Sequence, residues 1–268
     1  MLRPGLALIV PCYNEAARLN PQAFLDFVTS HPSVWLLFVD DGSADDTFRM
    51  LDRVQKTAPD SIGVMRLTSR QGKAEAVRLG ILEGIRREAD LVGFWDADLS
   101  TPLLAVDDFL ALARRRSGME VILGSRVMLM GRDIRRKAWR HYLGRVFATL
   151  VSLTLDLPVY DTQCGAKVFR VNEATAAVFA RPFRSRWIFD VEVLARYLDQ
   201  PVQTGDPPRR SRIYELAVPV WHHQPHSKLR WSDFVRAMFD LVGIWRDRAK
   251  AGRGGLYRFR HVGRRANR

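Results

Sequence analysis

Residues 6–15 read Leu-Ala-Leu-Ile-Val-Pro-Cys-Tyr-Asn-Glu, an aliphatic run that ends in polar side chains. The same change recurs in residues 35–43, Trp-Leu-Leu-Phe-Val-Asp-Asp-Gly-Ser, and in residues 91–98, Leu-Val-Gly-Phe-Trp-Asp-Ala-Asp. Short apolar runs with turn residues at their ends are typical of buried strands. Each of the three segments therefore predicts a strand that is followed directly by a polar loop.

Helical patterns lie between the predicted strands. Two further apolar runs, Gly63–Leu67 and Val121–Leu123, extend the set of strands, and helices are predicted over Pro21–Ser30, Asp45–Thr57, Gly72–Glu88 and Leu103–Arg116. Strands that alternate with helices predict an α/β fold with a Rossmann-like, doubly wound and mostly parallel sheet. Ligands of such sheets bind beyond the carboxyl ends of the strands, which is where the polar residues stand.

The composition is that of a globular protein with a large positive charge. The 268 residues include 42 Lys and Arg against 29 Asp and Glu, a net charge of +13, and 47% of them are hydrophobic. Cys12 and Cys164 are too few for a disulfide framework, which favours a reducing compartment. The longest apolar runs fall well short of the ~18 residues that a spanning helix needs. We therefore expect a cytoplasmic protein, soluble or peripheral on the inner face of the membrane.

Two common nucleotide-binding motifs are missing from the chain. The first loop carries Pro11-Cys12-Tyr13-Asn14 in place of the glycine fingerprint of dinucleotide-binding folds. Gly72-Lys73 lacks the earlier glycine of a P-loop and is followed by Ala74. The sequence thus argues against an ordinary dehydrogenase or P-loop enzyme.

Asp96 and Asp98 follow a predicted strand and are separated by one residue. Side chains two apart on an extended backbone project to the same face. Two carboxylates on one face repel each other unless a cation lies between them, and such hard oxygen ligands suit Mg²⁺ or Mn²⁺ shared with substrate phosphates. The pair predicts a metal site for a diphosphate leaving group.

These residues resemble family 2 glycosyltransferases with the GT-A fold. Six motifs in the expected order, within about residues 6–245, carry the resemblance: Val10–Glu15, Val39–Ser43, Asp96-Ala97-Asp98, Gly124-Ser125-Arg126, Tyr160–Phe169 and Ser185–Glu192. The last three are similar to the polyprenyl-phosphate or dolichyl-phosphate β-glucosyltransferase branch. The resemblance implies a hexosyltransferase with an acceptor-side extension of the sheet.

Roles for single residues follow from that resemblance. The positions that would hold the nucleotide-sugar donor are Pro11, Tyr13, Glu15, Asp41, Lys73, Asp96 and Gln163. Asp96 and Asp98 match the positions that bind the metal, and Arg126, Asp161 and Asp190 match the catalytic positions. Trp187 and Glu192 fall in the acceptor-side motif, and Ser100 stands where some relatives have a better metal ligand.

The implied reaction is an inverting displacement at the anomeric carbon of a UDP-sugar, with glucose as the implied hexose. A lipid-phosphate acceptor is already anionic and needs little help from a base. Arg126 and the nearby basic residues would hold its phosphate; these are Arg132, Arg135, Arg136, Lys137 and Arg140. The alternative is a soluble or polysaccharide hydroxyl acceptor, for which Asp161 or Asp190 would have to take the proton.

We divide the chain into three parts. Residues 1–124 form the nucleotide-sugar-binding half, residues 125–227 the acceptor-binding half of the same domain, and residues 228–268 an amphipathic helix with a basic tail. The helix, predicted over Lys228–Trp245, has an apolar stripe that suits either the core or a membrane interface. Residues 246–268 hold nine basic residues and one acid, which suits an anionic membrane surface.

Two other functions receive little support. A nucleic-acid-binding protein is not expected, because the positive charge is concentrated in the tail and no aromatic residues alternate with it in a recognisable RNA motif. His222, His223 and His226 invite a zinc interpretation, but no fourth ligand stands at a suitable spacing.

Overall fold

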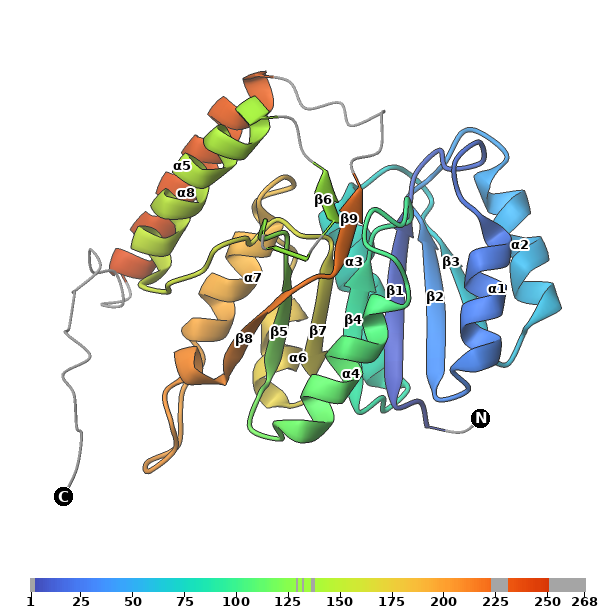
Figure 1. The fold of residues 1–268 in the computed structure, drawn as a ribbon, viewed down its shortest axis with the longest axis horizontal. Helices are drawn as coiled ribbons and strands as arrows, with labels where there is room; N and C mark the ends of the chain where they lie inside the picture. The colour runs from blue at the N-terminus through green and yellow to red at the C-terminus, as the bar shows by residue number, and fades with distance from the viewer. Residues whose placement is uncertain (1–2, 129, 132, 136–137, 223–230, 251–268) are drawn as a thin grey trace.

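The structure is a computed structural model that describes residues 3–128, 130–131, 133–135, 138–222 and 231–250. Seven strands form one sheet in the order β3-β2-β1-β4-β7-β5-β8 (Figure 1). They are β1 (Leu6–Cys12), β2 (Val34–Asp40), β3 (Ile62–Arg66), β4 (Leu91–Trp95), β5 (Val121–Ser125), β7 (Ala166–Arg170) and β8 (Ile213–Ala217). Neighbouring strands are parallel except at β7, which runs antiparallel to β4 and β5. The predicted α/β fold with a mostly parallel sheet is confirmed.

The helices lie on both faces of this sheet (Figure 1). They are α1 (Pro21–Ser30), α2 (Thr47–Thr57), α3 (Lys73–Arg86), α4 (Ala105–Arg115), α5 (Ala138–Leu155), α6 (Glu173–Phe179), α7 (Phe189–Leu198), a 3-10 turn (Arg209–Arg212) and α8 (Trp231–Lys250). The four helices predicted between the first strands begin and end within two residues of the observed bounds of α1 to α4. A further pair of short strands, β6 (Asp133–Arg135) and β9 (Val220–His222), lies beside the main sheet.

Two apolar layers cover the faces of the sheet. Ala7 and Ile9 of β1 point into the layer that contains α3, α6 and α7, whereas Leu8 and Val10 point into the layer that contains α1 and α4. This alternation follows from the two-residue period of a strand. Helix α3 comes very close to β1 at Gly80, where a Cβ would stand 2.6 Å from Ile9. The packed layers fix the ends of β1 and β4, and so the residues that follow them.

The chain changes direction across the sheet at β1. From β1 it proceeds to β2 and β3 on one side, and then returns to place β4 on the other side of β1. A crevice opens at such a switch point, beyond the carboxyl ends of the two central strands. The end of β1 leads into Tyr13, and the end of β4 leads into Asp96. Topology therefore puts two of the predicted polar clusters side by side.

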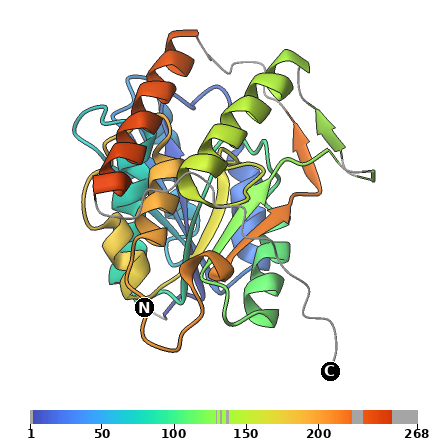
Figure 2. The same ribbon diagram turned by 90° about the vertical axis from the view of Figure 1, so that its left-hand side faces the viewer.

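Helices α5 and α8 lie side by side at one end of the sheet (Figures 1 and 2). Val151 of α5 and Leu241 of α8 are buried in the same layer as α7. On the outer side, large apolar side chains remain exposed, namely Val146, Phe239, Val242 and Trp245. Among the described residues, none of the helices combines the length and the apolar character needed to cross a bilayer.

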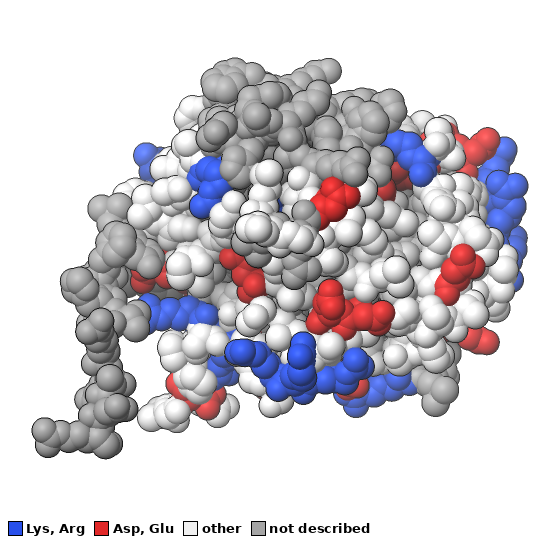
Figure 3. All heavy atoms as spheres, viewed as in Figure 1, with Lys and Arg blue, Asp and Glu red and all other residues white. Residues whose placement is uncertain are grey.

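Charged side chains are unevenly distributed on the face drawn in Figure 3. Lys and Arg gather along its lower edge, with acidic side chains above them. The sequence places nine of its basic residues after Trp245, and most of these lie outside the described residues. The net positive charge of the described residues is therefore smaller than that of the whole protein.

Candidate active site

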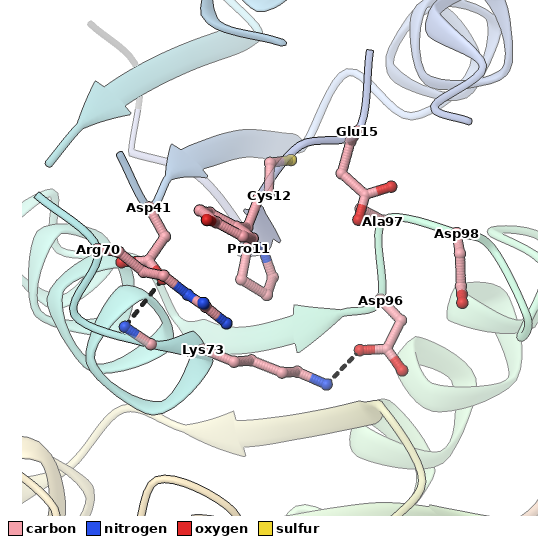
Figure 4. A pocket seen from close by; sticks show the side chains of 11 residues that line it. Pro11, Cys12, Glu15, Asp41, Arg70, Lys73, Asp96, Ala97 and Asp98 are labelled. Atoms are coloured by element: carbon pink, nitrogen blue, oxygen red, sulfur yellow. Dashed lines mark hydrogen bonds and ion pairs between the residues drawn. The ribbon is translucent and has the colours of Figure 1, made fainter. Parts of the chain in front are cut away.

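A pocket of about 310 Å³ opens at the carboxyl ends of β1, β2 and β4 and at the start of α3 (Figure 4). We call it the rim pocket. Its lining residues are Pro11, Cys12, Tyr13, Glu15, Asp41, Arg70, Gly72, Lys73, Asp96, Ala97 and Asp98. Seven of the residues predicted to bind donor or metal are among them, and they come from four segments that are far apart in the sequence.

Asp41 shapes one edge of the rim pocket. Its two carboxylate oxygens accept hydrogen bonds from the backbone N–H groups of Gln71, at 2.7 Å, and Gly72, at 2.8 Å. Gly72 has a φ of 101°, in the left-handed region that favours glycine. The side chain of Asp41 therefore holds the loop that leads into α3 and places Lys73 at the pocket.

Asp96 is held by contacts on two sides. One oxygen forms an ion pair with Lys73. The carboxylate also lies against Gly165, because a Cβ on that residue would stand 1.8 Å from Oδ2 and 2.5 Å from Oδ1 of Asp96. Burial alone would raise the pKa of Asp96, but the charges of Lys73 and Lys167 outweigh it, so the pKa lies below its usual value. Asp96 is thus ionised and held in one orientation.

Asp98 lies on the same loop and faces the same pocket (Figure 4). One of its oxygens accepts a hydrogen bond from the backbone N–H of Ser100, at 3.0 Å. Within the described residues, no group of three His, Cys, Asp or Glu side chains stands close enough together to hold a metal ion. Asp96 and Asp98 therefore fit a divalent ion that takes its remaining ligands from substrate oxygens and water, as Mg²⁺ and Mn²⁺ commonly do.

Glu15 closes the pocket on the side of β1. Glu15 is buried, with 7% of the residue exposed, and its carboxylate is bound by both Nε and Nη2 of Arg18. Burial raises the pKa of Glu15 above its usual value, and the positive charge of Arg18 offsets this only in part. The backbone N–H of Glu15 donates to the hydroxyl of Thr47, at 2.7 Å, which ties this loop to the start of α2.

Tyr13 and Arg70 form a flat contact at the pocket edge. The guanidinium carbon of Arg70 lies 4.3 Å from the centre of the Tyr13 ring. A planar cation over an aromatic face is a stable arrangement, and both groups offer flat surfaces on which a base can stack. The sequence predicted Tyr13 but missed Arg70, because a single arginine after a strand carries no signal of its own.

Arg126 and Asp161 form a tight pair beside the rim pocket. Nε and Nη2 of Arg126 donate to the two oxygens of Asp161, at 2.5 and 2.7 Å, and the backbone N–H of Arg126 donates to Oδ2 at 3.1 Å. The backbone N–H of Gln163 also donates to Asp161, at 3.0 Å. Both oxygens of Asp161 are therefore engaged, an arrangement that suits the orientation of Arg126 better than the removal of a proton. Nε2 of Gln163 is buried and has no hydrogen-bond partner within the described residues.

Asp190, the second residue of α7, pairs with a lysine that the sequence analysis did not single out. Nζ of Lys167 lies 2.6 Å from Oδ1 of Asp190, and its side chain is 0% exposed. The same ammonium donates to the backbone carbonyl of Cys164, at 2.5 Å. A buried lysine needs such partners, because an isolated ammonium is costly to remove from water.

The predicted acceptor-side residues, the histidines and the basic run lie outside the lining of the rim pocket or outside the described side chains. Glu192 accepts hydrogen bonds from the backbone N–H groups of Arg184 and Ser185 and so holds the loop before α7, while Trp187 on that loop is 40% exposed. His222 lies 2.6 Å from Asp133, and His223 and His226 lie outside the described residues. The basic residues from Arg132 to Arg140 also fall where side chains are not described.

Comparison with known proteins identifies the family. Residues 7–172 match Glycosyl transferase family 2. The chain belongs to glycosyl transferase family 2. A dolichyl-phosphate beta-glucosyltransferase of Trichomonas vaginalis is 30% identical over 91% of this chain and 74% of that protein. The dolichyl-phosphate beta-glucosyltransferase of Mus musculus is 32% identical over 90% of this chain and 77% of its own length.

The fold of this family 2 chain is also found in solved structures. Glucosyl-3-phosphoglycerate synthase from Mycobacterium tuberculosis, crystallised with Mn²⁺, UDP-glucose and phosphoglyceric acid, has a TM-score of 0.64. The alignment covers 92% of this chain and 80% of that one, with 16% identity. At such an identity the likeness concerns the fold alone, and it agrees with the GT-A fold expected from the motifs.

Sequence reasoning found the part of this family 2 site that follows the strands. Residues such as Asp96 and Asp98 were found because they stand directly after a strand that the hydrophobic pattern marks. Lys167 and Gly165 were missed, because they act from β7, whose place between β4 and β5 no local pattern shows. A lysine next to the apolar residues of β7 was the signal in the sequence that could have pointed to a buried ion pair.

Proposed function

We propose that this chain is a metal-dependent, inverting hexosyltransferase that moves glucose from UDP-glucose to a polyprenyl-phosphate lipid. Two observations support the proposal. The relatives at 30% and 32% identity are named dolichyl-phosphate beta-glucosyltransferases and align over nine tenths of the chain. The observation that carries it is the pair Asp96 and Asp98, which face one pocket and need further oxygen ligands to complete a metal site.

The donor would lie in the rim pocket with its diphosphate toward Asp96 and Asp98. Mg²⁺ or Mn²⁺ bound there would neutralise the negative charge that develops on the leaving diphosphate. Tyr13 and Arg70 would flank the base, while Pro11 and Glu15 would border the nucleoside. Asp41 would act through the loop that it holds, because its oxygens already bind the backbone at Gln71 and Gly72.

The reaction itself asks little of a base. An oxygen of the lipid phosphate attacks the anomeric carbon, the bond to the β-phosphate oxygen breaks, and its electron pair leaves with UDP. Arg126, held in place by Asp161, would steady the phosphate of the acceptor, since a planar guanidinium binds oxyanions well. Asp190 and Gln163 would border the sugar on the acceptor side. Catalysis would then rest on orientation and on charge stabilisation.

Membrane binding is part of the same proposal. The exposed apolar residues of α5 and α8 include Phe239 and Trp245, and the residues that follow are strongly basic. An amphipathic helix next to a basic segment suits a cytoplasmic membrane surface with anionic lipids. We propose that this end of the molecule lies on the membrane, so that the acceptor phosphate can reach the rim pocket.

A transfer assay with the purified chain tests the function. Radiolabelled UDP-glucose and a polyprenyl phosphate in detergent micelles are expected to give a labelled lipid in the presence of Mn²⁺ or Mg²⁺, and none after chelation with EDTA. Donor preference is read from parallel reactions with GDP-mannose. Transfer to a soluble hydroxyl acceptor with no labelled lipid would favour the hydroxyl-acceptor alternative instead. Transfer that is unchanged by EDTA would contradict the role of the metal.

A further inference from the structure

The ammonium group of Lys73 forms an ion pair with Asp96, one of the two carboxylates proposed to bind the metal ion. Lys73 is the first residue of α3, and its side chain crosses the pocket to reach Oδ1 of Asp96 (Figure 4). The side chains of Lys73 and Asp96 are 41% and 33% exposed, so the pair is open to solvent and to ligands. The ion pair therefore blocks the oxygen that a metal ion could otherwise use.

Asp96 has little freedom to offer its carboxylate in another way. Its carboxylate lies against Gly165, where a Cβ would stand 1.8 Å from Oδ2 and 2.5 Å from Oδ1. Trp95 pairs with Ala166 in the antiparallel register of β4 and β7, which fixes the distance between the two loops. A cation that binds Asp96 must therefore compete with Lys73 for this carboxylate.

Lys73 is by contrast a long and mobile partner. A lysine side chain has four rotatable bonds, and its ammonium can exchange one oxyanion for another at small cost. The diphosphate of a bound nucleotide would enter the same pocket and offer Lys73 a second anionic partner. Once Lys73 has moved, Asp96 and Asp98 lack its positive charge, and two carboxylates on one loop attract a divalent ion.

We propose that Lys73 acts as an exchangeable counter-ion that keeps Asp96 closed to metal ions until a nucleoside diphosphate draws it away. Metal and nucleotide then bind cooperatively, and each raises the affinity of the other by the same factor. This inference rests on the proposed function, because it takes the nucleotide diphosphate to be the ligand of the rim pocket. Lys73 would then favour binding of the nucleotide before, or together with, the metal ion.

Titration of the full-length chain with Mn²⁺ alone tests the inference. Free Mn²⁺ is followed by electron paramagnetic resonance, first without and then with saturating UDP. The variant Lys73→Met replaces the side chain by an unbranched, uncharged one that is one atom shorter, and Lys73→Gln is a second variant in case the first does not fold. Lys56→Met is the matched control, because Lys56 is an exposed lysine of α2 that pairs with Asp52, away from the rim pocket.

The expected result is a change in Mn²⁺ affinity in the absence of nucleotide. Wild type and Lys56→Met should bind Mn²⁺ weakly alone and at least about tenfold more tightly with UDP. Lys73→Met should bind Mn²⁺ alone about tenfold more tightly than wild type, and UDP should strengthen its Mn²⁺ binding by a smaller factor than in wild type. The further change Asp98→Ala in the Lys73→Met background should remove the gained affinity, which would assign it to the rim pocket.

The outcomes separate this inference from the proposed function. If Lys73→Met and Lys73→Gln bind Mn²⁺ alone no better than wild type, while UDP still strengthens Mn²⁺ binding, the counter-ion role is wrong and the proposed metal site stands. If no variant binds Mn²⁺ with or without UDP, both the inference and the metal-dependent function are wrong.

Discussion

Carboxylates at the two opposite ends of the sheet differ in how many protein groups bind their oxygens. Glu120 directly precedes β5, at the amino end of the parallel strands, and Asp96 and Asp98 follow β4 at the carboxyl end. Glu120 is bound by the hydroxyl of Tyr197, at 2.8 Å, and by the guanidinium groups of Arg209 and Arg212, both at 2.6 Å. Its side chain is only 10% exposed.

The comparison separates a structural use of charge from one that suits function. Protein donors surround Glu120, and its ion pairs tie the segment before β8 to the sheet. At the rim pocket, Asp96 pairs with the partly exposed Lys73 and Asp98 accepts a backbone hydrogen bond from Ser100, so a ligand can compete for both carboxylates. A carboxylate that still has room for a ligand, such as Asp98, therefore indicates a binding site better than one that is surrounded by protein donors, such as Glu120.

The largest effect is expected for Asp98→Ala. Removal of this carboxylate leaves Asp96 as the remaining metal ligand of the pair, so glucosyl transfer should fall by about 100-fold or more while the fold is retained. Steady-state rates and calorimetric titration of UDP with and without Mn²⁺ check this. The exposed Asp52→Ala is the control and should behave as wild type. A metal-dependent UDP titration that is unchanged in Asp98→Ala would contradict the assignment of the site.

A large loss of stability, without a direct effect on the site, is expected for Glu120→Ala. The change leaves Arg209 and Arg212 without their shared carboxylate in a partly buried place, which should lower the free energy of unfolding by about 3 kcal/mol. Urea unfolding followed by circular dichroism measures it. The folded fraction should keep the UDP and Mn²⁺ affinity of wild type, and a specific loss of that affinity would show that the two ends of the sheet are coupled.

The Glu120 cluster should also make stability depend on pH in the acid range. Burial alone would raise the pKa of Glu120, but hydrogen bonds from Arg212 and Tyr197 outweigh it, so the pKa in the folded protein lies below the ordinary value of 4.5. The contribution of Glu120 is therefore complete above that value and is lost as the pH falls through the lower pKa of the folded state. The difference in unfolding free energy between wild type and Glu120→Gln should be constant at neutral pH and shrink below about pH 4.5. A difference that does not change with pH would contradict the lowered pKa.

The smallest effect is expected for an ion pair that faces solvent. Lys56 and Asp52 stand four residues apart on α2, at 2.7 Å, and the lysine side chain is 74% exposed. Such pairs contribute about 0.3–0.5 kcal/mol and are screened by salt. Lys56→Ala should therefore change the unfolding free energy by no more than about 0.5 kcal/mol. A loss as large as that of Glu120→Ala would mean that burial is not what separates the two classes of ion pair.

The sequence by itself determined the strands of the first half, their helices and the residues that follow the strand ends. Hydrophobic runs such as Leu6–Cys12 and Leu91–Trp95 are local patterns, and the right-handed crossover rule brings the carboxyl ends of parallel strands to one edge. Tyr13, Asp41 and Asp98 could therefore be placed at the same edge from the sequence. The division of the chain at residues 124 and 227 stays a prediction, although the strands on both sides of residue 124 share one sheet.

Only the tertiary structure decided which partners these residues meet. The insertion of β7 between β4 and β5 brings Gly165 against Asp96 and buries Lys167 beneath Asp190. Arg126 and Asp161 are 35 residues apart in the chain and meet because both flank that insertion. The physical reason is that neighbouring residues determine a strand and the polar loop that follows it. An ion pair across the rim depends instead on the order of the strands in the sheet, which no local sequence pattern shows.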